Sequence, residues 1–239
     1  MFLHQTTVGF IFKERELGEA DKIFSIFSKD FGRIELLGKS VRKISSKLRW
    51  GMEIFSFSQV EFVEGKFQKR LVGVQPLEKF KNLKRNLKKL SIAFKISEIL
   101  NSLIKGEERD ERIYQLIKET FSKLNSSIFD REKVLYLYFF WNLISLLGYQ
   151  PQLNFCSSCR KKEGVNFYFD FSLGGLICEK CFKNVKIGKR IDQNSIKLLK
   201  ILLKRKVNLL EKLRIEKETL NLTFLLSEKY FNFLIENET

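Results

Sequence analysis

The chain contains four cysteines, and they occur as two identically spaced pairs. The first pair is Cys156 and Cys159, and the second is Cys178 and Cys181, each with the pattern Cys-x-x-Cys. The number of residues between the two pairs falls within the range found in structural zinc sites, in which four thiolates surround one Zn²⁺. The sequence therefore predicts one structural zinc ion, bound by all four cysteines in a knuckle at about residues 153–184.

Two disulfide bonds are the alternative use of these cysteines. The first seven residues lack the basic and apolar regions of a secretory signal peptide. Zinc is favoured because disulfides are rare in the reducing cytosol and nothing in the sequence indicates export. Four thiolates leave no ligand position open for water, so the metal is expected to support the fold rather than catalysis.

The net charge of the chain narrows the classes of partner. The 239 residues carry a formal charge of +16, which points to nucleic acid, an anionic membrane surface or an acidic protein. Biased base composition in the genome can also make a chain rich in lysine. The positions of the basic residues, rather than their number, must therefore decide whether the chain binds nucleic acid. The most apolar segment, residues 134–147, is shorter than the roughly 20 residues of a membrane span and predicts a buried core helix.

Residues 5 to about 77 have the pattern of five short strands. The expected strands are residues 8–12, 22–28, 33–37, 55–63 and 67–77. Such a series, with one long basic loop after the third strand, fits a small closed barrel such as the OB-fold. An SH3-like barrel would give a similar pattern.

From Leu83 onward the apolar residues recur at helical spacing. Helices are expected at residues 83–103, 110–124, 131–148, 191–206 and 217–236. The change of period near Pro76 predicts an OB-fold nucleic-acid-binding domain at residues 1–78 and a helical domain at residues 79–239. Because helices lie on both sides of the cysteines, the knuckle is an insertion into the helical domain. The expected fold class is α+β.

The loop after the third strand, residues 38–50, is the strongest candidate for DNA binding and is called the basic loop below. It contains no acidic residue and five basic ones: Lys39, Arg42, Lys43, Lys47 and Arg49. Lysine and arginine neutralise phosphates, and the serines of the loop can donate hydrogen bonds to them. The alternative is a solvated loop. Trp50 would suit stacking on an unpaired base, but it is expected to fill the bottom of the barrel instead.

A second group of basic residues precedes and enters the first expected helix. It comprises Lys79, Lys81, Lys84, Arg85, Lys88 and Lys89. With Leu83, Leu87 and Leu90 facing inward, these residues are expected to form an outer stripe. A solvated helix face is the usual explanation, and a basic track continuous with the basic loop is the alternative. Arg33, Lys84 and Lys88 complete the predicted DNA-binding set.

More basic residues flank the knuckle, and they are expected either to extend the track or to bind an acidic peptide tail. They are Arg160, Lys161, Lys162, Lys180, Lys183, Lys186, Lys189 and Arg190.

Catalysis is not expected. Gly38-Lys39-Ser40 resembles the end of a phosphate-binding loop, but position 33, where that motif needs a glycine, is arginine. The single histidine, His4, is expected to be an ordinary surface residue. Glu14, Glu16, Glu19 and Asp21 are expected in the loop between the first two strands, as loop charges and turn caps rather than as Mg²⁺ ligands.

Several segments resemble the RecO family of recombination-repair proteins. Residues 15–23 contain the Gly-Glu-x-Asp-x-Ile pattern found near the start of that family, and residues 38–43 resemble its basic stretch. Residues 147–153 lead into the first cysteine pair, and residues 174–181 close the knuckle, as in the family. Two features differ: Arg160 stands where a glycine commonly follows the second cysteine, and residues 183–190 are unusually basic.

The resemblance implies an OB-fold, a helical domain and a zinc knuckle in a bacterial, cytoplasmic, nucleoid-associated protein without a membrane role. It also implies binding of single- and double-stranded DNA, annealing of complementary strands, and work with RecR and single-strand-binding protein in loading RecA. Some members lack the cysteines, which favours a structural metal. The alternatives are a zinc-containing adaptor that mainly binds an acidic protein tail, and an RNA-binding zinc-ribbon factor.

Overall fold

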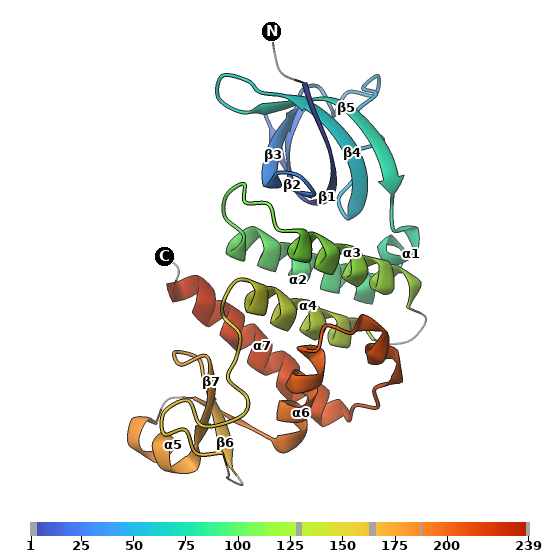
Figure 1. The fold of residues 1–239 in the computed structure, drawn as a ribbon. Helices are drawn as coiled ribbons and strands as arrows, with labels where there is room; N and C mark the ends of the chain where they lie inside the picture. Colours follow the sequence, from blue (N-terminus) through green and yellow to red (C-terminus); the bar gives the residue numbers. More distant parts are fainter. Residues whose placement is uncertain (1–3, 128–130, 163–165, 187, 238–239) are drawn as a thin grey trace. The chain divides into compact units, whose positions relative to one another are not determined.

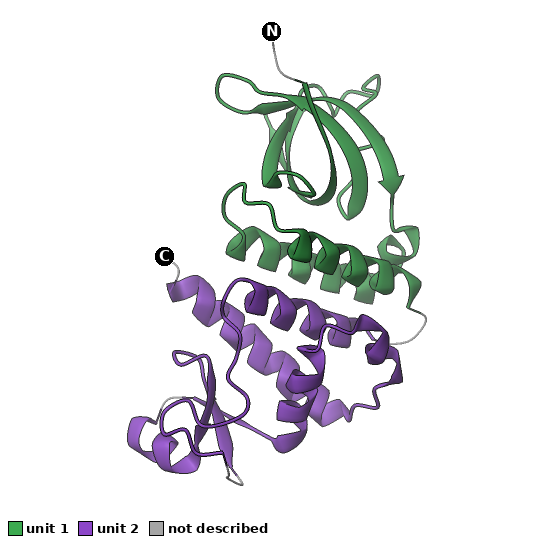
Figure 2. Cartoon of the chain, viewed as in Figure 1, with its two compact units in different colours: residues 1–128 green, residues 129–239 purple. Residues whose placement is uncertain are grey.

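The computed structural model describes residues 4–127, 131–162, 166–186 and 188–237. The chain forms two compact units, residues 1–128 and residues 129–239 (Figure 2).

The first unit contains a closed barrel of five strands (Figure 1). The strands are β1 (His4–Leu17), β2 (Asp21–Ser28), β3 (Gly32–Gly38), β4 (Ser56–Val63) and β5 (Lys69–Glu78). Their order around the ring is β1-β2-β3-β5-β4, and every pair is antiparallel except β3 and β5. The α+β class and the five-stranded barrel expected from the sequence are therefore confirmed.

Apolar side chains from all five strands fill the barrel, and the loop between β3 and β4 closes one part of it. Val41 and Met52 of this loop are buried in the barrel core, with Leu48 and Ile54 packed against them. The prediction that Trp50 fills the barrel is wrong, because Val41 and Met52 are the residues of this loop that lie in the core. Trp50 itself is 68% exposed.

Strand β1 is longer than the sequence pattern indicated. Its polar second half pairs with β2 as far as Leu17, opposite Asp21. Glu14, Glu16 and Asp21 are therefore strand residues, which corrects their expected place in a loop, whereas Glu19 lies in the turn between the strands. The pairing holds despite the polar sequence because this part of β1 is mostly solvent-exposed and Glu14 forms a 2.6 Å ion pair with Lys22 of β2.

Three helices follow the barrel in the first unit: α1 (Lys81–Lys84), α2 (Leu87–Leu103) and α3 (Glu111–Ser126). The expected helix from Leu83 is interrupted, because Asn86 ends the first segment and caps α2 by accepting a hydrogen bond from Lys89 N. The interruption changes which side chains face inward. Leu87 is 84% exposed and Lys89 is buried, so the predicted faces of these two residues are wrong.

Helices α2 and α3 pack on aromatic side chains of the barrel. The ring of Phe10 lies 4.2 Å from that of Phe121, and Phe55 lies 4.9 Å from Phe94. The Ser97 hydroxyl donates a 2.5 Å hydrogen bond to the main-chain oxygen of Phe12. The compact unit thus extends beyond the domain boundary expected after residue 78, and that boundary remains a prediction.

The second unit is helical and carries a small antiparallel sheet of order β7-β6-β8. Its elements are α4 (Glu132–Leu146), β6 (Phe167–Asp170), β7 (Gly175–Cys178), α5 (Glu179–Val185), β8 (Lys189–Ile191), α6 (Gln193–Leu202), the 3₁₀ helix η1 (Val207–Lys212) and α7 (Lys217–Asn237).

Helix α4 is the centre of the second unit, and all of its apolar residues except Leu146 are buried, as predicted. Trp141 Nε1 donates a 2.8 Å hydrogen bond to the Ser227 hydroxyl of α7. Asn142 Nδ2 donates to the main-chain oxygen of Leu202 at the end of α6. Among the described residues, no helix combines the length and the apolar character needed to cross a membrane.

Candidate metal centre and nucleic-acid interface

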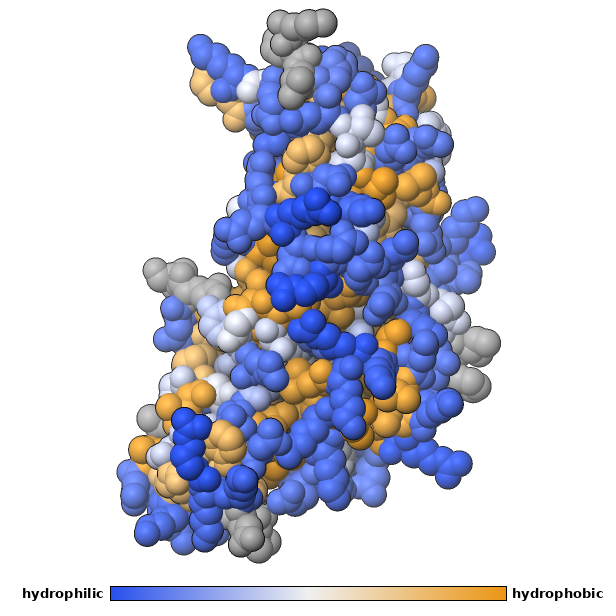
Figure 3. Space-filling view, in the orientation of Figure 1, coloured by the Kyte–Doolittle hydropathy of each residue, from blue (hydrophilic) through white to orange (hydrophobic). Residues whose placement is uncertain are grey.

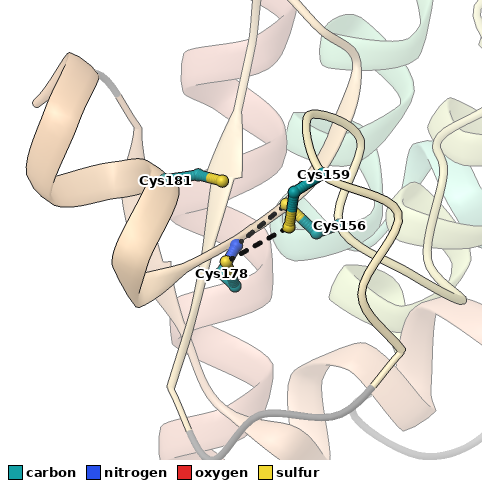
Figure 4. A group of neighbouring side chains, drawn as sticks. All are labelled: Cys156, Cys159, Cys178 and Cys181. Carbon is teal, nitrogen blue, oxygen red and sulfur yellow. Dashed lines mark hydrogen bonds between the residues drawn. The ribbon is translucent and has the colours of Figure 1, made fainter.

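The four cysteines converge on one point in the second unit (Figure 4). Their sulfur atoms all lie within 4.8 Å of one another, and the Sγ atoms of Cys159 and Cys178 are 3.7 Å apart. Cys156 and Cys159 come from the loop before β6. Cys178 ends β7, and Cys181 lies in α5, which follows directly.

This arrangement fits a tetrahedral metal ion. Zinc–sulfur bonds of about 2.3 Å place the sulfur atoms of a tetrahedral site about 3.8 Å apart. The separation of Cys159 and Cys178 agrees with that value, and the cysteines are free rather than joined as disulfides. The four-cysteine cluster is therefore able to bind one metal ion, as its spacing predicts.

Main-chain N–H groups favour the thiolate form of the most buried ligand. Burial raises the pKa of Cys156, but hydrogen bonds from the N–H groups of Cys159, Cys178 and Ser158 lower it to about 6. For Cys181, the Ser158 hydroxyl lowers the pKa, whereas burial and the other three thiols raise it to about 12. A bound cation would favour the thiolate at all four positions.

The turn after the first cysteine pair forms even though it contains arginine instead of glycine. Arg160 has a φ of +63°, in the left-handed region that favours glycine. Its N–H donates to the main-chain oxygen of Cys156 at 2.9 Å, and its guanidinium lies 4.9 Å from the centre of the Phe155 ring. This cation–π contact offsets part of the cost of the backbone conformation.

The basic loop lies between β3 and β4, and its five basic side chains are exposed. Arg42 forms a 3.2 Å ion pair with Glu16. No described acidic residue forms an ion pair with the other four, which are Lys39, Lys43, Lys47 and Arg49. The loop therefore keeps most of its positive charge available to a partner.

The first part of the basic loop is bound to the segment between β1 and β2. The Ser40 N–H donates a 2.7 Å hydrogen bond to the Asp21 carboxylate, and the Arg42 N–H donates to the main-chain oxygen of Ala20 at 3.0 Å. Asp21 is thus a cap, as expected, but it caps the basic loop. Sequence reasoning missed this link, because the two segments are far apart in the chain.

The last part of the basic loop is bound to the second basic group. Lys79 Nζ donates to the main-chain oxygen of Trp50 at 2.8 Å. Glu53 forms ion pairs with Lys79 at 2.7 Å and with Lys84 at 3.0 Å. Burial raises the pKa of Glu53, but the hydrogen bonds from both lysines lower it more, so the net shift is downward. The two basic groups are therefore neighbours, and Glu53 neutralises part of the second one.

Arg33 occupies a different position from the basic loop. Its Nη1 atom donates hydrogen bonds to the main-chain oxygens of Asn101 (2.8 Å) and Ile104 (2.6 Å), at the end of α2. Arg33 therefore caps this helix. Lys88 lies on the exposed side of α2.

The remaining titratable candidates do not form a catalytic group. The exposed His4 ring lies 2.8 Å from a carboxylate oxygen of Glu61, which agrees with its expected surface role. Across the described residues, the four cysteines form the one cluster of metal-ligand side chains.

Comparison with known proteins decides the family. Residues 1–80 match the family model described as Recombination protein O N terminal, and residues 84–239 match the one described as Recombination protein O C terminal. The chain belongs to the RecO family. The resemblance noted in the sequence is therefore confirmed.

Relatives of this RecO chain cover nearly its whole length. The DNA repair protein RecO of Dehalococcoides mccartyi is 30% identical over 97% of this chain and 91% of its own. The RecO protein of Thermodesulfovibrio yellowstonii is 30% identical, over 92% of this chain and 88% of its own length. The RecO protein of Caldanaerobacter subterraneus is 29% identical, over 87% of this chain and 84% of its own length. RecO proteins are non-enzymatic recombination mediators, so family membership confirms the expectation that the chain is not an enzyme.

Proposed function

We propose that this RecO protein binds single- and double-stranded DNA through the basic loop and anneals complementary strands. The observation that carries the proposal is that this loop is held in place while most of its cations lack ion pairs within the part of the chain that the structure describes. Four of its exposed cations have no ion pair with a described residue, and hydrogen bonds fix the loop to Asp21 of β2 at its start and to Lys79 at its end. A fixed group of unpaired cations attracts phosphates with little loss of conformational entropy on binding.

Annealing follows from charge neutralisation and needs no bond chemistry. Two complementary strands repel each other through their phosphates. A basic surface that binds both strands lowers this repulsion and raises their local concentration. Because phosphate contacts carry no sequence information, the bases remain free to pair and the preference for particular sequences should be weak.

The predicted partners and compartment belong to this proposal. We expect the protein to act in the bacterial cytoplasm, on the nucleoid, with RecR and single-strand-binding protein, and to support the loading of RecA indirectly. The support is membership of a family of DNA repair proteins from bacteria. We also assign one structural Zn²⁺ to Cys156, Cys159, Cys178 and Cys181, because their sulfur spacing suits a tetrahedral ion.

A salt titration tests the proposal. Affinity for a single-stranded oligonucleotide should fall with salt at a log–log slope of about −0.7 per neutralised phosphate. Replacing Lys39, Arg42, Lys43 and Lys47 by glutamine should weaken binding at every sequence and make the slope shallower by about 2 to 3 units.

A second variant with the same change of net charge tests whether the loss of DNA affinity is specific to the basic loop. Replacing four lysines around the knuckle, Lys180, Lys183, Lys186 and Lys189, by glutamine removes the same net charge. This control should change DNA affinity less than the basic-loop variant does. A salt-independent affinity, or equal losses in the two variants, would contradict a site at the basic loop.

The adaptor alternative has one observation in its favour. Lys229 of α7 lies beside Lys189, and this like charge lowers the pKa of Lys229. Two adjacent ammonium groups favour an anionic partner. If the region binds an acidic protein tail, the knuckle variant should lose retention of single-strand-binding protein in a nuclease-treated pull-down, while the basic-loop variant keeps it. The RNA-binding alternative predicts faster annealing of RNA than of DNA.

A further inference from the structure

The two tryptophans of the chain lie in opposite environments. Trp141 is fully buried and its indole N–H is hydrogen-bonded to Ser227. Trp50, at the end of the basic loop, is 68% exposed. A tryptophan left in water forgoes the large gain from burying its ring, so an exposed indole beside unpaired cations is a candidate binding surface.

Hydrogen bonds and close packing hold the backbone at Trp50 and at the residue that follows it. The main-chain oxygen of Trp50 accepts the hydrogen bond from Lys79 Nζ. The next residue, Gly51, donates its N–H to Leu48 and accepts a 2.8 Å hydrogen bond from the Ser58 hydroxyl. A Cβ atom at Gly51 would lie 2.6 Å from Val74, so the chain packs directly on the barrel here. The indole therefore projects from a rigid attachment.

The surroundings of the indole indicate the chemistry of its ligand. Lys47 and Arg49 lie close to Trp50 in the chain and form no ion pair with any residue that the structure describes. Hydrophilic residues cover most of the visible face of the protein, with apolar groups between them (Figure 3). A flat aromatic ring next to free cations suits a flat apolar group joined to a phosphate, which is the chemistry of an unpaired nucleotide.

We propose that Trp50 stacks on an unpaired base of single-stranded DNA and thereby favours single strands over duplex. This inference rests on the proposed function and adds the residue that distinguishes the two forms of DNA. In a duplex the bases are stacked on each other and their faces are closed to the indole. The cations of the basic loop bind phosphates of either form, whereas Trp50 binds only the exposed base face.

Three variants test this role in the full-length protein. Trp50→Ala removes the ring, and Trp50→Phe keeps a smaller aromatic face. Ile44→Ala removes another apolar side chain of the same loop, one that is 88% exposed but has no aromatic ring. Affinity is measured by fluorescence anisotropy, at one salt concentration, for a labelled oligothymidylate and for a duplex of the same length.

The expected result is selective. Trp50→Ala should weaken single-strand binding by roughly 5- to 100-fold and change duplex affinity by less than about two-fold. Trp50→Phe should retain most of the affinity, and Ile44→Ala should match the wild type. An abasic oligomer, which keeps the phosphates and lacks the bases, should bind wild type and Trp50→Ala equally. Single-stranded DNA should quench the tryptophan fluorescence of the wild type, and this quenching should be lost in Trp50→Phe.

Other results overturn the inference. Equal losses for single strands and duplex, an unchanged affinity in Trp50→Ala, or an equal effect of Ile44→Ala would each do so. These outcomes leave the proposed function intact if binding of the wild type still depends on salt. If the wild type binds no single-stranded DNA, the proposed function fails together with the inference. Equal thermal midpoints for the wild type and the variants confirm that the fold is unchanged.

Discussion

The Ser40 N–H donates a 2.7 Å hydrogen bond to the carboxylate of Asp21, nineteen residues earlier in the chain. This bond joins the first residue of β2 to the start of the basic loop, at a position where Ser40 has a φ of +53°. The Gly-Glu-x-Asp-x-Ile segment thus helps to hold the residues proposed to bind phosphates.

Replacing Asp21 by alanine should lower DNA affinity, although it adds positive charge. The reason is that the basic loop loses its cap and pays a larger entropic cost on binding. Glu19→Ala is the matched control, because Glu19 is exposed in the turn before β2 and its loss changes the net charge equally. Anisotropy titrations should show weaker binding for Asp21→Ala only. Tighter binding by both variants would mean that charge alone governs the affinity.

Replacing Glu53 by glutamine should have opposite effects on binding and on stability. The change releases Lys79 and Lys84 from their ion pairs, so DNA affinity should rise about two- to five-fold if these lysines reach phosphates. Thermal stability should fall slightly. An unchanged or lower DNA affinity would contradict phosphate contacts of Lys79 and Lys84.

The contribution of Glu53 to stability should depend on pH in one direction. Its folded pKa lies below the ordinary value of 4.5, so the stabilisation is complete above that value. It is lost as the pH falls through the folded pKa. The difference in thermal midpoint between wild type and Glu53→Gln should therefore be constant near neutral pH and shrink in acid. A midpoint difference that grows as the pH falls would contradict a lowered pKa of Glu53.

Replacing Arg33 by glutamine should destabilise the first unit by about 1 to 3 kcal/mol, because the end of α2 loses charged hydrogen bonds. Arg70→Gln removes the same charge from an exposed position of the same barrel and should be nearly neutral. Urea unfolding measures both changes. Equal DNA affinities for the two variants are expected if Arg33 acts only as a helix cap, and a specific loss in Arg33→Gln, beyond its effect on folding, would support the predicted DNA-binding role of Arg33.

Replacing Arg160 by glycine should stabilise the knuckle relative to Arg160→Ala by about 1 kcal/mol. Both variants lose the contact with Phe155, but only alanine keeps a side chain at a φ of +63°. The comparison of the two variants isolates the free-energy cost of a side chain at this positive φ. Thermal unfolding of the metal-loaded protein measures that cost. Equal midpoints would show that the turn relaxes away from the left-handed conformation.

Removing the metal, by chelation or by Cys156→Ser, should unfold much of the second unit and leave the barrel folded. Hydrogen exchange should then accelerate in residues 131–237 and stay slow in β1–β5. Added zinc should restore protection in the chelated wild type and fail to do so in Cys156→Ser. Full protection without metal would contradict a structural role.

The sequence was most informative where a local pattern has a single physical solution. The cysteine spacing led to the cluster, and the largely apolar sequence of α4 led to a buried helix. Prediction from the sequence failed where a contact with a distant residue decides whether a side chain is buried. Trp50 is exposed because Val41 and Met52 fill the barrel core, and Leu87 is exposed because the cap at Asn86 restarts the helix. Nor does the local sequence reveal that Arg33 reaches the end of α2.

The parallel seam between β3 and β5 is the shortest in the ring, with Leu36 opposite Lys69 and Leu37 opposite Arg70. Its two strands are separated in the chain by the whole basic loop and by β4. On a ribosome, the ring cannot close until β5 has left the exit tunnel. Until then β4, β1, β2 and β3 can form only an open sheet whose edge strands, β3 and β4, lack their partner, and such unpaired edges expose a nascent chain to aggregation.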